Sequence, residues 1–318
     1  MAAVRARQPR LQPGYHGHHF TRPAIRPRHY CASPSSPTTL TRLGSRWYHD
    51  PRKVAASVSV ISAALCYQFL EVIPWTNRAH FIFLSPQSER AHGLAEFADY
   101  KQEVASKILG PRHPHSVRAR RIAERIIHAG IDDAVILRVA SNRHKGKAWL
   151  PPPQTRHLHG LDWEVIVVDH KGNTGAYCTR GGKIVLYTGL LDHFKTDGEI
   201  AFAIAHEVAH MIARHESEIT STKWVTKPLY YYFRRRTETE ADHIGILLLA
   251  AAGFDPHIAL TFFKKNAKLV QFETFKEYYL SSHPPYQRRL QFLSQPKIMK
   301  TALELYREAT SIKDSIKR

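Results

Sequence analysis

The sequence predicts a mainly helical α+β domain that follows one N-terminal apolar segment. Three features lead to this prediction. Apolar residues recur with helical spacing along much of the chain, short apolar runs bounded by turn residues predict a small sheet, and a stretch near the N-terminus carries no charge. The 318 residues are 43% hydrophobic and 10% aromatic, which suits a sizeable globular core.

Residues 1–53 are rich in Arg, Pro and Ser and contain a single acid, Asp50. Nine arginines and Lys53 give this segment a charge of +9, about half of the +19 of the whole chain. This composition is typical of an organellar transit peptide, and the density of arginine favours the mitochondrion over the chloroplast. The alternative is a disordered basic arm that binds nucleic acid. No basic fold with interleaved aromatic residues follows it, so we favour targeting.

Residues 54–73 predict a single transmembrane anchor, at the short limit of length for a span. No charge occurs from Val54 to Leu70, and the apolar run continues to Ile73. Basic residues and Trp75 flank it, as they do at membrane interfaces. Several serines lower its hydrophobicity, so the alternative is a buried core helix or part of a signal.

A soluble domain is predicted at residues 78–300, followed by a helical tail at 301–318. Helices are expected at residues 94–109 and 116–129, separated by the breaker Gly110-Pro111, and strands at 134–140, 163–169 and 183–187, with a further strand or interface segment at 81–84.

The most informative stretch is residues 196–215, TDGEIAFAIAHEVAHMIARH. Thr196 and Glu199 form a capping-box pattern, which predicts the start of a helix there. His206, Glu207 and His210 make the motif H-E-x-x-H, and residues four apart share one face of a helix. Both imidazoles can therefore point at one ion, with the glutamate beside them to reach a water: the layout of a zinc hydrolase helix.

A third ligand is predicted on a second helix, after a linker that contains Trp224 and the aromatic run 230–233. Glu238 begins the pattern E-x-x-A-D, and the helix runs to Gly253. A carboxylate at Glu238 completes a two-histidine site and leaves the fourth position for water. Asp242, one turn on, can accept a hydrogen bond from a ligand imidazole. The alternative is that these acids are ordinary first-turn residues. The three cysteines are too few and too scattered for a Cys-based site.

Three segments carry a family resemblance: HEVAHMIARH at 206–215, ETEAD at 238–242 and SHPPYQRR at 282–289. Together they resemble the gluzincin family that contains the HtpX-like and CAAX-prenyl zinc proteases, over roughly residues 74–295. The segment from Pro74 through HFIFLS is similar to the mitochondrial inner-membrane branch of that family. The resemblance implies a zincin-like domain whose sheet has an edge strand flanking the H-E-x-x-H helix.

The resemblance also implies roles for individual residues. One zinc ion per chain would be held by His206, His210 and Glu238, with Glu207 as the general base. His283 would lie beside the zinc, and Arg289 would stabilise the oxyanion or position that histidine. The edge strand that pairs with an extended substrate would consist of Lys183, Ile184, Val185, Leu186 and Tyr187.

One segment departs from the family pattern. Where relatives read N-A-F-A-L-P-G-G before that strand, this chain reads GAYCTRGG at 175–182, without the asparagine and the proline. This difference puts the shape of the cleft and the substrate preference in doubt and leaves the zinc set untouched.

The expected activity is zinc-dependent endopeptidase cleavage of proteins in or at the membrane, in quality control or stress-triggered processing. Glu207 would take a proton from the attacking water and pass it to the leaving amine. The expected location is the mitochondrial inner membrane, with a single-pass anchor in the bilayer and the catalytic domain in the intermembrane space. We expect no nucleic acid partner and allow for a homo-oligomer. The alternatives are a catalytically silent scaffold and, on charge alone, a nucleic-acid-binding protein.

Overall fold

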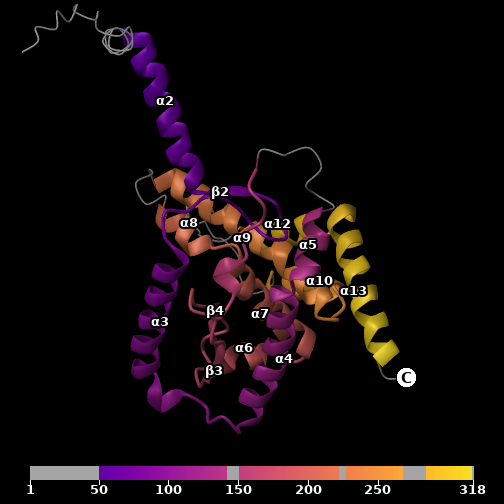
Figure 1. Cartoon of the computed structure of the whole chain (residues 1–318). Coiled ribbons are helices and arrows are strands. Elements are labelled where there is room, and N and C mark those ends of the chain that lie inside the picture. Colours follow the sequence, from indigo (N-terminus) through magenta and orange to yellow (C-terminus); the bar gives the residue numbers. More distant parts are fainter. Residues whose placement is uncertain (1–49, 142–149, 222–226, 268–283, 317–318) are drawn as a thin grey trace, which may run out of the picture. The chain divides into compact units, whose positions relative to one another are not determined.

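The computed structural model describes residues 50–141, 150–221, 227–267 and 284–316 (Figure 1). Contacts divide the chain into two units, residues 1–58 and 59–318, and helix α2 runs across this division. In chain order the described elements are α2 (Pro51–Gln68), β1 (Leu70–Val72), β2 (Ala79–Phe81), α3 (Pro86–Glu103), η1 (Ala105–Lys107), α4 (Pro114–Ile131), α5 (Asp133–Ser141), η2 (Arg156–Leu158), β3 (Glu164–Val168), β4 (Ala176–Cys178), β5 (Lys183–Tyr187), α6 (Thr188–His193), α7 (Asp197–Ile212), α8 (His215–Ser221), α9 (Lys227–Ala251), α10 (His257–Asn266), α12 (Tyr286–Leu293) and α13 (Pro296–Ile316).

The predicted anchor at 54–73 falls on α2 and on strand β1. Among the described residues, no helix is both long and apolar enough to cross a membrane. The rest of the description concerns the unit at residues 59–318, which is mainly helical with two small sheets.

The core of this unit is built around α7 (Figure 1). The helix begins with the predicted capping box: the Thr196 hydroxyl accepts from the Glu199 N–H, and the Glu199 carboxylate accepts from the Thr196 N–H. It is apolar on most sides and almost entirely buried. A helix of this kind must be covered all round, and α4, α9 and α10 pack against it.

The three-stranded sheet has the order β3-β5-β4, with β3 parallel and β4 antiparallel to β5. Strand β5 (Lys183–Tyr187) is therefore central, and the prediction that it is the edge strand is wrong. Lys183 to Leu186 are all buried, as expected for a strand that is covered on both faces of the sheet. The edge strand that packs against α7 is β4, residues Ala176–Cys178.

Three further expectations are corrected. The predicted strand at 134–140 is helix α5, because Ile136, Val139 and Ala140 are buried at helical spacing and the Asp132 carboxylate accepts from the Ala134 N–H at 2.9 Å. The aromatic run at 230–233 belongs to α9, which begins three turns earlier than expected. The boundary drawn at residue 301 falls inside α13, whose Ala302 and Leu305 belong to the main core.

Candidate metal centre

The site forms where α9 crosses α7. Glu238, Asp242 and Gly245 lie at positions i, i+4 and i+7 of α9 and so share one face. A methyl group placed on Gly245 would lie 3.3 Å from the backbone N and Cα of His206. The two helix backbones therefore approach closely at the first histidine of the motif, which brings the carboxylates of α9 within reach of α7.

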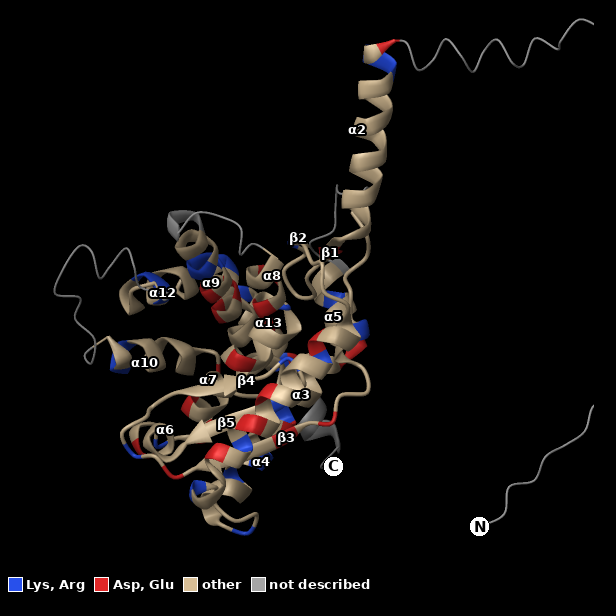
Figure 2. Cartoon of the chain, turned by 90° about the vertical axis from the view of Figure 1, so that its left-hand side faces the viewer, with Lys and Arg blue, Asp and Glu red and all other residues tan. Residues whose placement is uncertain are grey.

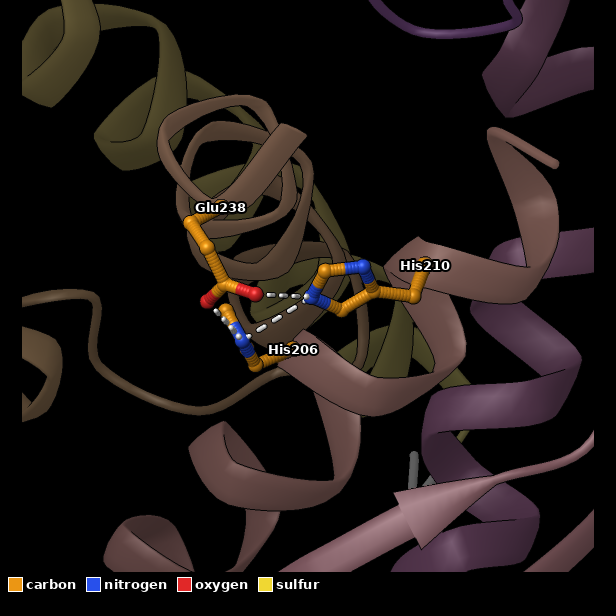
Figure 3. Close-up of side chains that lie close together, drawn as sticks. All are labelled: His206, His210 and Glu238. Carbon is orange, nitrogen blue, oxygen red and sulfur yellow. Dashed lines mark hydrogen bonds and ion pairs between the residues drawn. The ribbon is translucent and has the colours of Figure 1, made fainter. Parts of the chain in front are cut away.

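Three side chains converge at this crossing (Figure 3). His206 and His210 project from α7, and their Nε2 atoms lie 3.2 Å apart. From α9, the Glu238 carboxylate lies 3.4 Å from Nε2 of His206 and 3.5 Å from Nε2 of His210. The ligand atoms of all three residues lie within 4.8 Å of one another.

These separations fit a divalent ion with a tetrahedral shell. Zinc binds imidazole nitrogen and carboxylate oxygen at about 2.0–2.2 Å, so that neighbouring ligand atoms lie roughly 3.3–3.5 Å apart. The donor set of two imidazoles and one carboxylate, with a fourth position left over, is also that of catalytic zinc sites. His206 and Glu238 are buried, whereas the His210 side chain is 19% exposed, so the site is open to solvent on the His210 side alone among these three residues.

Asp242 contacts the ring of His206 at Nδ1, the nitrogen that does not face the metal site. This nitrogen lies 3.0 Å from Asp242 Oδ1, as the sequence predicted for a residue one turn beyond Glu238. Arg289 donates two hydrogen bonds to the same carboxylate, of 2.7 and 2.6 Å. Burial alone would raise the pKa of Asp242, but the charge and hydrogen bonds of Arg289 hold that pKa below its usual range. An ionised Asp242 fixes the tautomer that leaves Nε2 of His206 with its lone pair toward the site.

The two histidines differ in their own proton affinity when no ion is present. Burial lowers the pKa of His206, but its hydrogen bonds to Asp242 and Glu238 outweigh burial and raise the value to about 10. Burial dominates at His210 and lowers its pKa well below the ordinary value. A cation that binds at Nε2 of His206 therefore competes with a proton there.

Glu207 lies on the side of α7 that faces the sheet edge. Its charge acts on the half-buried Cys178 of β4, and burial together with this charge raises the pKa of the Cys178 thiol. A pocket of about 20 Å³, enough for one water, is lined by His210, Cys178 and Arg180 among others. The second histidine of the motif and the sheet edge thus border one small space.

The surface that α9 and α12 share is basic. Lys and Arg residues occur on the first half of α9 and on α12 (Figure 2). A pocket of about 330 Å³ is lined by Arg235, Arg236 and Arg288 of these helices. Its other lining residues include Thr239, next to Glu238, so this positive surface adjoins the metal site.

The predicted residues are brought together only in part. His206, His210, Glu238 and Asp242 form one cluster, whereas His283 lies outside the described residues. Arg289 is buried, and its short contacts go to Asp242. The sequence reasoning missed His215 and Glu240, although His215 is the last residue of HEVAHMIARH and Glu240 lies within ETEAD.

A helix with two histidines and a glutamate, completed by a carboxylate from a second helix and flanked by a sheet edge, defines a metal-dependent hydrolase. Comparisons with known proteins agree. The model of peptidase family M48 matches residues 152–233 and 217–297.

The chain is also similar to individual characterised proteins. It is 33% identical to the mitochondrial metalloendopeptidase OMA1 of Arabidopsis thaliana, over 83% of this chain and 69% of that protein. The protein of the same name from Saccharomyces cerevisiae is 26% identical, over 76% and 73% of the two chains. The beta-barrel assembly-enhancing protease of Escherichia coli is 24% identical over 36% of this chain and 30% of its own. The chain belongs to peptidase family M48 and is a metalloendopeptidase of the zinc-dependent class, so its substrates are proteins.

Proposed function

We propose that His206, His210 and Glu238 hold one zinc ion for peptide hydrolysis. The observation that supports this most is that one ligand atom from each residue lies within 4.8 Å of the other two, with the two imidazole Nε2 atoms 3.2 Å apart. Zinc in this position would polarise the scissile carbonyl and make a water acidic enough to lose a proton near neutral pH.

Glu207 is the general base in this proposal. It adjoins the first histidine of the motif and faces β4, so it can take the proton of the attacking water and return it to the leaving amine. The raised pKa of the Cys178 thiol argues against Cys178 as a nucleophile. Attack by a water that zinc activates requires no covalent intermediate. Arg289 acts through Asp242 to hold His206, and His283 stays a predicted contributor to oxyanion stabilisation.

The substrate binds as an extended strand along β4 rather than along β5. Within the described residues, β4 pairs with β5 alone and packs against α7, the helix that carries the two histidines. Main-chain pairing at such an edge tolerates many substrate sequences. Strand β4 lies within the segment 175–182 that departs from the family pattern, so substrate preference is where this chain should differ from its relatives.

The proposed setting is the mitochondrial inner membrane. Two relatives carry the word mitochondrial in their names, and residues 1–53 have the composition of a transit peptide. In this proposal α2 attaches the chain to the membrane as a single-pass anchor. The elements from β1 to α13 form the catalytic domain, in the intermembrane space, because β1 pairs with β2 and both Ile73 and Leu305 belong to the main core. It cleaves proteins in or at the bilayer, in quality control or in response to stress. Import and protease protection test the location.

Glu207→Gln tests the mechanism. The variant should keep its zinc, measured as metal content after dialysis, and lose at least about 10³-fold in kcat on an unfolded membrane protein, because the proton acceptor is gone. The matched control is Glu124→Gln, an exposed glutamate of α4, which should cleave normally.

Two outcomes would contradict the proposal. Normal cleavage by Glu207→Gln would remove Glu207 as the base, and unchanged zinc content in Glu238→Ala would remove Glu238 from the ligand set. A wild-type chain that binds zinc but cleaves nothing would favour the silent scaffold, which the altered segment 175–180 supports.

A further inference from the structure

Nδ1 of His210, the second histidine of the motif, has a different kind of hydrogen-bond partner from Nδ1 of His206, the first. Nδ1 of His206 meets the Asp242 carboxylate directly, whereas Nδ1 of His210 meets Nδ1 of another imidazole, His215, at 3.0 Å. The far nitrogen of His215, Nε2, lies 3.2 Å from Glu240 Oε2. All of these side chains are buried or nearly so, which strengthens the hydrogen bonds between them.

The direction of these hydrogen bonds is fixed at the carboxylate end. Glu240 receives the Nε–H of Arg78 at Oε2, at 2.6 Å, and the hydroxyl of Thr76 at Oε1, also at 2.6 Å. An ionised carboxylate only accepts, so a neutral His215 donates its Nε2–H to Glu240. Nδ1 of His215 then carries the lone pair and accepts the Nδ1–H of His210. What remains on His210 is a lone pair at Nε2, directed at His206 and Glu238.

The first donor in this series, Arg78, lies in the turn between β1 and β2. Its two Nη groups bind Glu218 at 2.7 and 2.5 Å, and its side chain is 14% exposed. The turn is held in an unusual shape: Trp75 and Asn77 both have positive φ, at 75° and 54°. Such a backbone needs tertiary support, and Trp75 is fully buried while Asn77 donates to the Ala140 carbonyl at 2.9 Å.

We propose that Arg78, Glu240 and His215 are positioning residues that orient His210 for the metal, so that the turn between β1 and β2 sets the metal affinity of the site. This inference rests on the proposed zinc site. It adds to that site a segment more than a hundred residues earlier in the chain, which the H-E-x-x-H motif does not include.

The chain offers a matched pair of variants. Glu240→Gln and Glu218→Gln each remove one buried carboxylate from Arg78, but only Glu240 contacts His215. The hydrogen-bonded series Arg78, Glu240 and His215 is called the relay below. If the relay orients His210, Glu240→Gln lowers zinc affinity by about 10- to 100-fold, while Glu218→Gln changes it by less than about threefold. Zinc affinity is measured by competition with a chromophoric chelator, on the full chain and on protein whose fold is checked by circular dichroism.

A second pair of variants, at His215, tests the same proposal if the variants of the first pair do not fold. Glutamine at 215 has an oxygen to accept from His210 and an N–H to donate to Glu240, whereas phenylalanine keeps the volume alone. His215→Gln should therefore bind zinc within about threefold of wild type, and His215→Phe should lose about 10- to 100-fold. If His215 only filled space, zinc affinity would not depend on whether residue 215 can donate and accept hydrogen bonds.

Equal losses of zinc affinity in Glu240→Gln and Glu218→Gln would overturn the relay, as would wild-type affinity in His215→Phe. Both results presuppose a wild-type chain that binds zinc. A wild-type chain that binds none would overturn the proposed function, and the relay with it.

Discussion

At the scale of single residues, the predictable part of the site is the part set by local geometry. His206 and His210 share a helix face because they are four residues apart, and Asp242 follows Glu238 by one turn. These relations hold in any α-helix, so the sequence alone suffices for them. The contact between His210 and His215 depends instead on the turn between α7 and α8, where Arg214 has a positive φ of 55°. No periodicity in the sequence carries that information.

His157 gives a prediction for stability against pH. Its Nε2–H donates to the Ile212 carbonyl at 2.8 Å, and burial, aided by the Arg214 charge, lowers its pKa to about 3. The unfolded chain takes up a proton near pH 6.5, whereas the folded chain does not until about pH 3. The folded state therefore loses stability as pH falls below about 6.5, by roughly 1.4 kcal/mol per pH unit from this residue.

His157→Gln keeps an N–H for the Ile212 carbonyl and removes this titration. From pH 7.5 to pH 5 the variant should gain about 2 kcal/mol relative to wild type. Urea unfolding of both proteins at the two pH values gives the difference, in which the titrations common to both cancel. A stability difference that stays constant over this range would show that His157 protonates equally in the folded and unfolded chains.

At the scale of elements, the sequence predicted the helices that form the site better than the strands beside it. The capping box at Thr196 and the stop at Gly253 were both correct, because each depends on a few neighbouring residues. The place of β5 in the sheet was wrong, because the order of strands depends on pairing with β3 and β4. Burial of four successive residues, Lys183 to Leu186, shows only that both faces of β5 are covered, which the sequence pattern does not convert into a position in the sheet.

Gly245 gives a prediction for the crossing of α7 and α9. The Cβ of Gly245→Ala would lie 3.3 Å from the His206 backbone, which cannot turn away as a side chain can. Helix α9 would have to shift and carry Glu238 and Asp242 with it. We expect zinc affinity to fall by about tenfold. The free energy of unfolding should change by less than about 1 kcal/mol, since alanine favours the helix and offsets part of the strain.

The control is Gly130→Ala on α4, where the nearest atom to an added Cβ is the mobile Cδ1 of Ile212 at 3.1 Å. That variant should bind zinc as the wild type does. Chelator competition on both proteins compares them directly. Undiminished zinc affinity in Gly245→Ala would mean that the crossing has room for a methyl group and that the glycine is not what sets the position of Glu238.

At the scale of the whole chain, charge divides into two parts with different expected roles. Residues 1–53 carry +9 of the total of +19, with almost no acid to balance it. In the unit at 59–318, many basic side chains instead belong to ion pairs, such as Arg78 with Glu218 and Glu240, and Arg289 with Asp242. Net charge alone is therefore weak support for a nucleic-acid-binding function.

This division predicts that the N-terminal arginines direct the chain to its compartment. A C-terminally tagged chain incubated with isolated mitochondria should become resistant to added protease, and replacement of the nine arginines of residues 1–53 by glutamine should abolish this protection. Replacement of Lys297 and Lys300, exposed on α13, by glutamine is the matched control and should leave import unchanged.

Rupture of the outer membrane should expose the tag to protease, and alkaline carbonate should leave the chain in the membrane pellet. A tag that stays protected after rupture would put the catalytic domain in the matrix. Release by carbonate would instead remove residues 54–73 as an anchor, because a spanning segment resists that extraction.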